Sequence, residues 1–293
     1  MNHSYYESSA RARIAGLLDA GSFDEWLPAA ERLTSPHLAT LEQPAAFDDG
    51  VVIGRGSIAG KPVFIAAQEG GFMGGAVGEV HGAKIVGMLE RAVRDRPAAA
   101  LLLVESGGVR LQEANAGLIA VSEVMRAILA VRAAGVPVIV AIGGQYGCFG
   151  GMGIASRCAT TIIISEEGRL GLSGPEVIET VRGVEEYDSR DRALVWRTVG
   201  GKHRYLLGEC DTIVADSMEA FRQAITASIA KGDDWSLAAL EREHRLLADR
   251  VQRFGDCQDG RDIWRKLGWP DPDAIAMLDN DEFMAAAQGH RAK

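Results

Sequence analysis

Residues 136–153 read VPVIVAIGGQYGCFGGMG, an apolar run followed directly by a stretch in which six of eleven residues are glycine. The unbroken apolar run, rich in valine and isoleucine, predicts a short strand buried on both faces, as in a parallel sheet. Glycine has a high entropic cost in a folded chain, so this density indicates a backbone that must approach something closely. Residues 143–153 are therefore the first candidate for a functional site.

The same arrangement occurs twice earlier in the chain. The turn EGGFMGGAVGE (69–79) follows the run VFIAAQ, and the turn ESGGVRLQE (105–113) follows ALLLV. In chain order, we call these and residues 143–153 the first, second and third turns. A helical pattern follows each, and strands that alternate with helices predict a largely parallel sheet. Turns from strand to helix lie at the carboxyl edge of such a sheet, so we expect all three to face one cleft.

Two further features complete the predicted sheet. Residues 51–68 predict a β-hairpin that turns at Ala59-Gly60, because two β-branched runs flank that pair. Residues 160–165 and 211–216 predict two more strands. The expected fold class is therefore α/β.

The helical patterns predict one buried stripe and one domain boundary. A helix is expected over 111–133, with an apolar stripe toward the core. Near residue 231 the composition changes to a charged amphipathic helix and then to an irregular tail. We therefore expect a core domain over 10–230 and a helical extension over 231–293. The stripe consists of Leu111, Leu118, Met125 and Leu129.

The composition argues against several classes of function. The chain has 293 residues and a formal net charge of −9, which disfavours binding to nucleic acid or to an anionic membrane. It contains no run of 18 apolar residues, and its first residues show no targeting signal, so we expect a cytoplasmic protein without membrane association. The four cysteines lack C-x-x-C spacing and a nearby histidine pair, so no metal site or disulfide framework is expected.

The chemistry of the three turns follows from the helices that they precede. At a helix N-terminus several N–H groups lack partners inside the helix, and the helix dipole is positive. Glycine leaves those N–H groups open to a ligand. Such a site suits a negative charge, either a phosphate or an oxyanion that forms during a reaction. Glycine also serves close packing and positive φ, but three such turns at one edge favour a functional role.

Some residues and motifs near the turns allow more than one interpretation. Cys148 could act as a nucleophile, although a buried inert thiol is the more common role. Arg110, a cation near a helix N-terminus, either holds a carboxylate bidentately or orders the loop. The motif GLSGPEV (171–177) does not match a serine nucleophile turn. The third turn matches neither a dinucleotide-binding motif nor a P-loop.

Four segments together resemble a known family. They are ARARIAGLLDAGSFDEW, GGFMGGAVGEVHGAKI, ESGGVRLQEA and GRLGLSGPEVIETV, and their order matches as well. They are similar to the carboxyltransferase branch of the crotonase superfamily, which implies a ClpP/crotonase fold of repeated ββα units. Within that branch the chain resembles β subunits of biotin-independent malonate decarboxylase, and next the carboxyltransferase β subunit of acetyl-CoA carboxylase. The absence of a four-cysteine zinc ribbon favours the decarboxylase, and the helical C-terminal extension resembles that subunit.

The resemblance implies a reaction and an assembly. The substrate would be a malonyl thioester on an acyl carrier protein with a CoA-like prosthetic arm, and the products acetyl thioester and carbon dioxide, through an enolate. This chain would bind no cofactor of its own and no biotin. A γ subunit would supply the second crotonase-like half, beside an acyl carrier protein subunit and an acyl-carrier transferase subunit. The alternatives are a subunit of a biotin-dependent acyl-CoA carboxylase and a non-catalytic scaffold half.

The resemblance also assigns residues. The backbone amides of Gly107, Gly108, Gly150 and Gly151 would form the oxyanion hole. The group that protonates the enolate stays open among Gln112, Glu113, Tyr146 and His81. Residues expected to bind the thioester are Gly74, Gly75, Ser106, Arg110, Gln112, Gly147, Cys148 and Phe149.

Overall fold

A single mixed sheet organises the computed structural model, which describes residues 4–42 and 47–292. The sheet has seven strands in chain order, from β1 to β7. The first three pair antiparallel, and each later strand pairs parallel with the one before it. The strands are β1 (Asp24–Trp26), β2 (Val51–Ile58), β3 (Lys61–Gln68), β4 (Ala99–Val104), β5 (Val138–Ile142), β6 (Thr161–Ser165) and β7 (Thr212–Val214).

The predicted hairpin and parallel strands are confirmed. The β2–β3 hairpin turns at Ala59 and Gly60, whose φ angles are 50° and 72°. Positive φ at both central residues is typical of the tight turns that match the twist of a hairpin. From β3 onward, each parallel strand is followed by a crossover that contains a helix, which brings the glycine turns to one edge.

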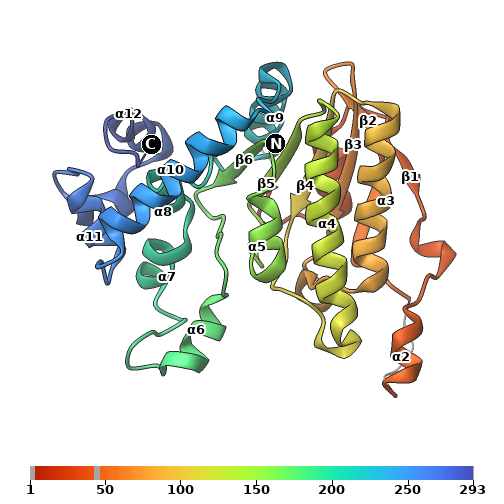
Figure 1. Ribbon diagram of the computed structural model, residues 1–293, viewed down its shortest axis with the longest axis horizontal. Coiled ribbons are helices and arrows are strands. Elements are labelled where there is room, and N and C mark those ends of the chain that lie inside the picture. The colour runs from red at the N-terminus through yellow and green to blue at the C-terminus, as the bar shows by residue number, and fades with distance from the viewer. Residues whose placement is uncertain (1–3, 43–46, 293) are drawn as a thin grey trace.

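Helices cover both faces of the sheet. Figure 1 shows α3, α4 and α5 side by side in front of it. Alternate residues of β4 point to opposite faces, so Leu102 packs with α3 and α4, and Leu101 packs with α1 and α9. The helices of this core are α1 (Ala10–Leu17), α2 (Pro36–Thr40), α3 (Glu79–Asp95), α4 (Asn115–Ala133), α5 (Gly150–Ser156) and α9 (Met218–Lys231).

The predicted buried stripe on 111–133 is wrong. The helix α4 begins only at Asn115, and Leu111 is 86% exposed in a short 3₁₀ turn before it. Leu118 and Leu129 are exposed as well. The face toward the core consists of small and β-branched residues, because α3 approaches so closely that a Cβ on Gly82 would lie 2.4 Å from the Cβ of Ala120. The three leucines of the predicted stripe therefore lie outside, and only Met125 of that stripe is partly buried against the core.

Single β-bridges form a second, minor layer beside the main sheet. Val77 pairs with Val109, Ser106 with Cys148, and Cys148 with Leu170. Each bridge lies after a main strand and before the next helix of its unit. This gives the succession of strand, short bridge and helix that ββα units require, and it confirms the crotonase-like fold class.

The C-terminal part packs onto the end of this core. Trp264 and Phe283 belong to the same hydrophobic cluster as Tyr205 and Leu206, and the Ala292 N–H donates to the Leu206 carbonyl at 2.8 Å. None of the helices in the described residues is both long and apolar enough to cross a membrane. The remaining helices are α6 (Pro175–Arg182), α7 (Arg192–Val199), α8 (Gly201–Leu206), α10 (Leu237–Phe254), α11 (Gly260–Lys266) and α12 (Asn280–Ala287).

Candidate active site

Backbone hydrogen bonds join the three glycine turns. The Gly107 N–H donates to the Gly74 carbonyl at 2.9 Å, which links the second turn to the first. The Ser106 N–H donates to the Gly147 carbonyl at 2.8 Å, and the Phe149 N–H donates to the Ser106 carbonyl at 2.8 Å. The second turn therefore lies between the other two, and the structure brings all three together at the carboxyl edge of the sheet.

Glycine is required at two points where backbones nearly touch. A Cβ on Gly150 would lie 2.9 Å from the Cα of Gly108, and a Cβ on Gly75 would lie 1.8 Å from the carbonyl oxygen of Glu105. Both glycines also have positive φ, 58° at Gly150 and 67° at Gly75. A side chain at either position would push the turns apart.

Hydrogen bonding distinguishes the four predicted oxyanion-hole amides. The amides of Gly107 and Gly150 already donate to the carbonyls of Gly74 and Leu172. The Gly108 N–H has only a long contact of 3.3 Å to the Ser106 hydroxyl. Gly151 is the second residue of α5, before Gly153, the first to donate within that helix. Of these four amides in the described chain, Gly108 and Gly151 are therefore the two without a short backbone hydrogen bond.

Three of the predicted binding residues, Ser106, Cys148 and Phe149, have buried side chains. The Ser106 side chain is buried, and its hydroxyl contacts both the N–H and the carbonyl of Gly108. Cys148 is fully buried beside the Ser156 hydroxyl, and burial raises the pKa of its thiol to about 12, which keeps it neutral. The Phe149 ring packs against Tyr187 in a separate hydrophobic cluster. These side chains shape the turns, and the structure supports the inert role for Cys148.

Both roles considered for Arg110 occur together, because it holds the carboxylate of Asp48 with two bonds and so orders the loop. Its guanidinium is buried and binds both carboxylate oxygens of Asp48. It also donates to the Ala76 carbonyl at 2.9 Å and to Glu113 at 3.2 Å. Glu113 in turn accepts from the Glu79 N–H at 2.6 Å, at the start of α3. Sequence reasoning missed Asp48, because it precedes a strand and lies far from every turn in the chain.

The four candidates for proton transfer differ in how far their side chains are buried. His81 is fully buried, and desolvation lowers its pKa to about 3. Glu113 is buried in the contact with Arg110. Tyr146 and Gln112 are exposed, and the Tyr146 ring lies beside Gly70 and Gly74 of the first turn. Only Tyr146 and Gln112 of these four therefore reach the surface at which a substrate would arrive.

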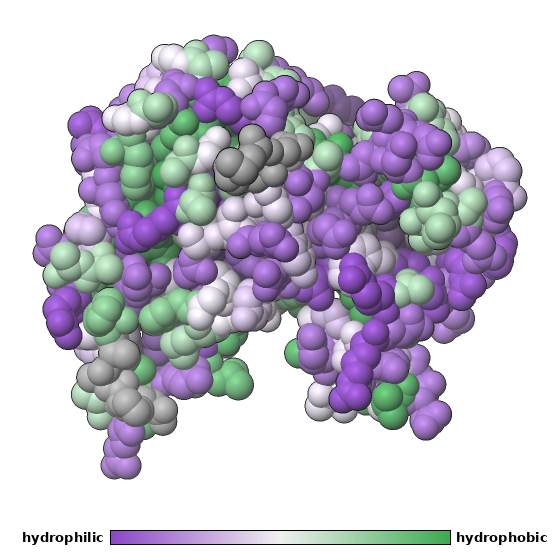
Figure 2. Space-filling view, turned by 180° about the vertical axis from the view of Figure 1, so that it is seen from behind, coloured by the Kyte–Doolittle hydropathy of each residue, from purple (hydrophilic) through white to green (hydrophobic). Residues whose placement is uncertain are grey.

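Exposed apolar side chains lie on the three turns and on elements that follow them. Figure 2 shows a notch in the lower edge of the molecule, between two downward projections that correspond to α2 and α6 in Figure 1. The exposed apolar residues on the turns and on the elements that follow them include Met73, Leu111, Leu118, Ile119, Tyr146, Ile154, Leu172, Val177 and Val181. We call this set the apolar rim.

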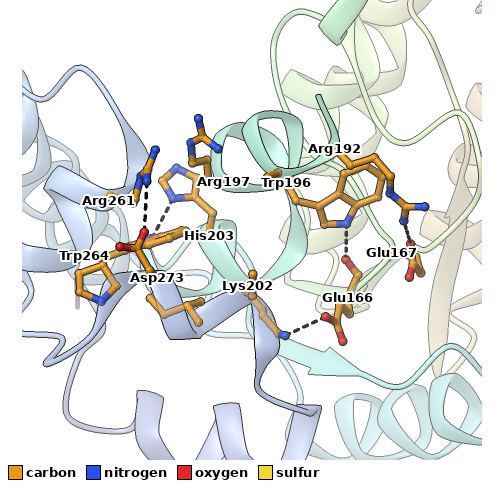
Figure 3. Close-up of a pocket in the computed structure, with 14 residues that line it drawn as sticks. Glu166, Glu167, Arg192, Trp196, Arg197, Lys202, His203, Arg261, Trp264 and Asp273 are labelled. Atoms are coloured by element: carbon orange, nitrogen blue, oxygen red, sulfur yellow. Dashed lines mark hydrogen bonds and ion pairs between the residues drawn. The ribbon is translucent and has the colours of Figure 1, made fainter. Parts of the chain in front are cut away.

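A separate pocket of about 340 Å³ lies between α7, α8 and α11. None of the predicted site residues lines it. Figure 3 shows that its charged groups bind one another, with Lys202 2.7 Å from Glu166 and Arg261 3.1 Å from Asp273. Within residues 4–42 and 47–292, no group of three or more His, Cys, Asp or Glu side chains could hold a metal ion. The glycine turns therefore remain the candidate site.

Known proteins share this arrangement. Residues 2–228 match the carboxyl transferase domain family. Malonyl-S-ACP:biotin-protein carboxyltransferase MADC of Malonomonas rubra is 40% identical, over 99% of this chain and 97% of its own length. The acetyl-coenzyme A carboxylase carboxyl transferase subunit beta of Fusobacterium nucleatum is 37% identical, over 62% of this chain and 61% of its own length.

Solved structures agree with these sequence relatives. A chain of a Pseudomonas malonate decarboxylase hetero-tetramer, in complex with malonate, has a TM-score of 0.79 and 42% identity. That match covers 88% of this chain and 95% of the other. A family model that covers most of the chain and a relative that matches almost all of it give the same result. The chain belongs to the carboxyl transferase family of the crotonase-like fold.

Proposed function

We propose that this chain is the β subunit of a malonate decarboxylase, which releases carbon dioxide from a malonyl thioester. The observation that carries the proposal is the pair of available amides, Gly108 and Gly151, on turns that meet. The resemblance to a Pseudomonas malonate decarboxylase chain, in a complex that holds malonate, supports the choice of substrate. The name of the Malonomonas relative supports delivery on an acyl carrier protein.

The chemistry requires stabilisation of one developing charge. When a malonyl thioester loses carbon dioxide, the electron pair of the broken carbon–carbon bond delocalises onto the thioester oxygen as an enolate. Amides aimed at that oxygen bind it more strongly in the transition state than in the substrate, so they raise the rate. Gly108 and Gly151 would donate to this oxygen. Tyr146 or Gln112, both exposed, would be placed to protonate the enolate carbon, directly or through water.

We further propose partners for the open face. The apolar rim leaves a large apolar surface exposed around the site, which is typical of a surface that another protein covers. Two Pseudomonas structures of this family, a hetero-dimer and a hetero-tetramer, contain different subunits together. A γ subunit with a second crotonase-like half would complete the site, and an acyl carrier protein would bring the thioester on its CoA-like arm. An acyl-carrier transferase subunit would load that carrier.

Organisation and location belong to the same proposal. The family match ends at residue 228, which supports a catalytic domain over 10–230 and an extension over 231–293. The four cysteines are free, which suits a reducing compartment such as the cytoplasm. The chain would hold no cofactor of its own, because the carrier's prosthetic arm brings the substrate.

One observation favours a second candidate function. The name of the Malonomonas relative describes transfer of a carboxyl group to a biotin protein. The same oxyanion hole would serve that reaction, because it also passes through a thioester enolate. The two functions differ in the fate of the carboxyl group. It either leaves as carbon dioxide or is transferred to biotin.

The two candidates separate in one assay. The chain is purified with its co-expressed partner subunits and supplied with malonyl thioester on the carrier, with avidin present to block biotin. We expect carbon dioxide and acetyl thioester to form under avidin. If acetyl thioester forms only when a biotinylated protein is added, and avidin stops its formation, the carboxyltransferase function is correct. If acetyl thioester forms neither with avidin nor with the biotinylated protein, both candidates are wrong.

A further inference from the structure

One buried carboxylate contacts all three turns. Glu105 is the first residue after β4 and opens the second turn, and its side chain is buried. It accepts the N–H of Tyr146, in the third turn, at 3.2 Å. A Cβ on Gly70 would lie 2.6 Å from its carboxyl carbon, and a Cβ on Gly144 would lie 2.4 Å from it. The carboxylate therefore lies against the backbone of the first and third turns while it belongs to the second.

The charge of this carboxylate is balanced from the N-terminal helix. Arg13 of α1 donates to Glu105, and both side chains are almost completely buried. Arg13 also donates to the Tyr5 carbonyl at 3.0 Å, which fixes its own position. A second link joins α1 to the first turn, because the Ala10 N–H donates to Glu69 at 2.9 Å. The N-terminal helix is thus bonded to the turns that carry the candidate site.

We propose that Glu105, held in place by Arg13, is a positioning residue that sets the distance between the oxyanion-hole amides of the second and third turns. The inference rests on the proposed function, because it assigns these amides to catalysis. In the second turn, Glu105 lies two residues before Gly107, whose N–H donates to the first turn. In the third turn, its partner Tyr146 lies five residues before Gly151. Loss of the carboxylate removes the bond to Tyr146 and leaves the two backbone hydrogen bonds at Ser106 between the second and third turns, so the spacing of the turns is less constrained.

Stability alone does not explain this ion pair. Replacing a buried pair with apolar side chains of similar volume is often neutral or stabilising, because the pair must first be removed from water. An apolar side chain, however, has no acceptor for the Tyr146 N–H. A variant with both charges replaced by apolar groups therefore separates the two roles. If the pair only stabilises the fold, the variant should keep its kcat; if the pair positions the turns, the variant should lose kcat.

The test compares three double variants within the assembled complex. The apolar double variant, Arg13→Met with Glu105→Leu, removes both charges and the acceptor. The amide double variant, Arg13→Met with Glu105→Gln, removes the charges but keeps an acceptor oxygen. The control is Arg132→Met with Asp233→Leu, since Arg132 and Asp233 form a 2.8 Å ion pair with a buried carboxylate away from the turns. The measurements are kcat and KM for the malonyl thioester, Tm, and amide hydrogen exchange.

Positioning predicts a kcat effect without a matching loss of stability. We expect the apolar double variant to lose about 100-fold in kcat, the size expected for a misplacement of about 1 Å, with KM changed less than about threefold. The amide double variant should recover at least about tenfold of that loss, and the control pair should keep its kcat. Peptides that cover 69–76 and 143–149 should exchange faster in the apolar double variant only.

Three results would overturn the proposal. The first is a kcat within about threefold of the unmodified chain in the apolar double variant, and the second is no recovery in the amide double variant. The third concerns the unmodified complex, so it applies even if no variant assembles: the Tyr146 amide exchanges as fast as an unbonded loop amide. If the unmodified complex shows no turnover, the proposed function is wrong, and the hydrogen-exchange results alone decide whether Glu105 couples the turns.

Discussion

Charged side chains gather in two regions of this molecule and do different things there. Beneath the glycine turns, Arg110 and Asp48 pair with side chains only 2% and 5% exposed. Around the pocket near α11, Arg261 and Asp273 pair at 38% and 70% exposure. A buried pair that loses a partner leaves an uncompensated charge, whereas water readily replaces a partner at the surface. We infer that the Arg110–Asp48 pair holds the backbone of the site and that the Arg261–Asp273 pair, which is largely exposed to water, contributes little to stability.

The largest expected effect is on stability beneath the turns. Asp48→Ala leaves the buried Arg110 without its two-bond partner and should cost about 3–5 kcal/mol of unfolding free energy. Urea unfolding of the complex followed by tryptophan fluorescence measures this loss. A loss below about 1 kcal/mol would contradict the distinction between the two regions.

The next effect concerns two adjacent glycines. Gly108 has a φ of 147°, which strains any other residue, and no atom lies within 4 Å of its added Cβ. Gly108→Ala should therefore rotate the backbone and misplace one oxyanion donor, which costs about 100- to 1000-fold in kcat, or about 2.7–4 kcal/mol. Gly107→Ala is the matched control, because its φ is not positive and its nearest contact is 3.3 Å.

Equal losses of kcat in the two variants would contradict the assignment of Gly108. A Gly108→Ala variant that weakens binding of the acyl carrier without changing turnover would instead indicate a scaffold role. Steady-state kinetics with the carrier-bound malonyl thioester separates these outcomes.

A smaller effect compares a buried histidine from each region. Burial lowers the pKa of both His81 and His203 from 6.5 to about 3. Between about pH 6.5 and 3 the unfolded chain therefore binds more protons than the folded chain, so stability should be lost as the pH falls through this window. The slope is about 1.4 kcal/mol per pH unit for each histidine.

His203 provides the cleaner measurement of this slope. Its Nδ1 accepts a hydrogen bond from the Trp264 indole at 3.1 Å, which requires that nitrogen to be unprotonated. His203→Gln should reduce the slope of unfolding free energy against pH by about 1.4 kcal/mol per unit between about pH 6 and 4. An unchanged slope would mean that His203 does not resist protonation in the fold.

The smallest effect belongs to the exposed pair. Asp273→Ala should change the unfolding free energy by less than about 1 kcal/mol, because Arg261 keeps contact with Asp259 and with water. The same urea experiment measures it beside Asp48→Ala. A loss of similar size in both variants would show that burial does not separate the two regions.

Local patterns predicted much of the architecture. The hairpin at Ala59-Gly60 and the buried strand at 138–142 follow from residues that are adjacent in the chain. Periodicity failed over 111–133, where Leu111 and Leu118 follow a helical spacing but are exposed, Leu111 in a 3₁₀ turn before α4. Spacing shows which residues share a face, but it does not show whether the core or a partner meets that face. The core face of α4 consists of small and β-branched residues because α3 packs closely against it at Gly82.

By itself, the sequence determined the strands β2 to β7, the three glycine turns and the family, because these depend on short segments and their order; the short strand β1 was not predicted. Only the tertiary structure decided which amides are available. Gly107 and Gly150 use their N–H groups on carbonyls of other turns and loops, while Gly108 and Gly151 do not. The roles of Asp48 and Glu105 were likewise decided by the fold. A buried charge takes its function from the groups that surround it, and those groups come from segments that are far apart in the chain.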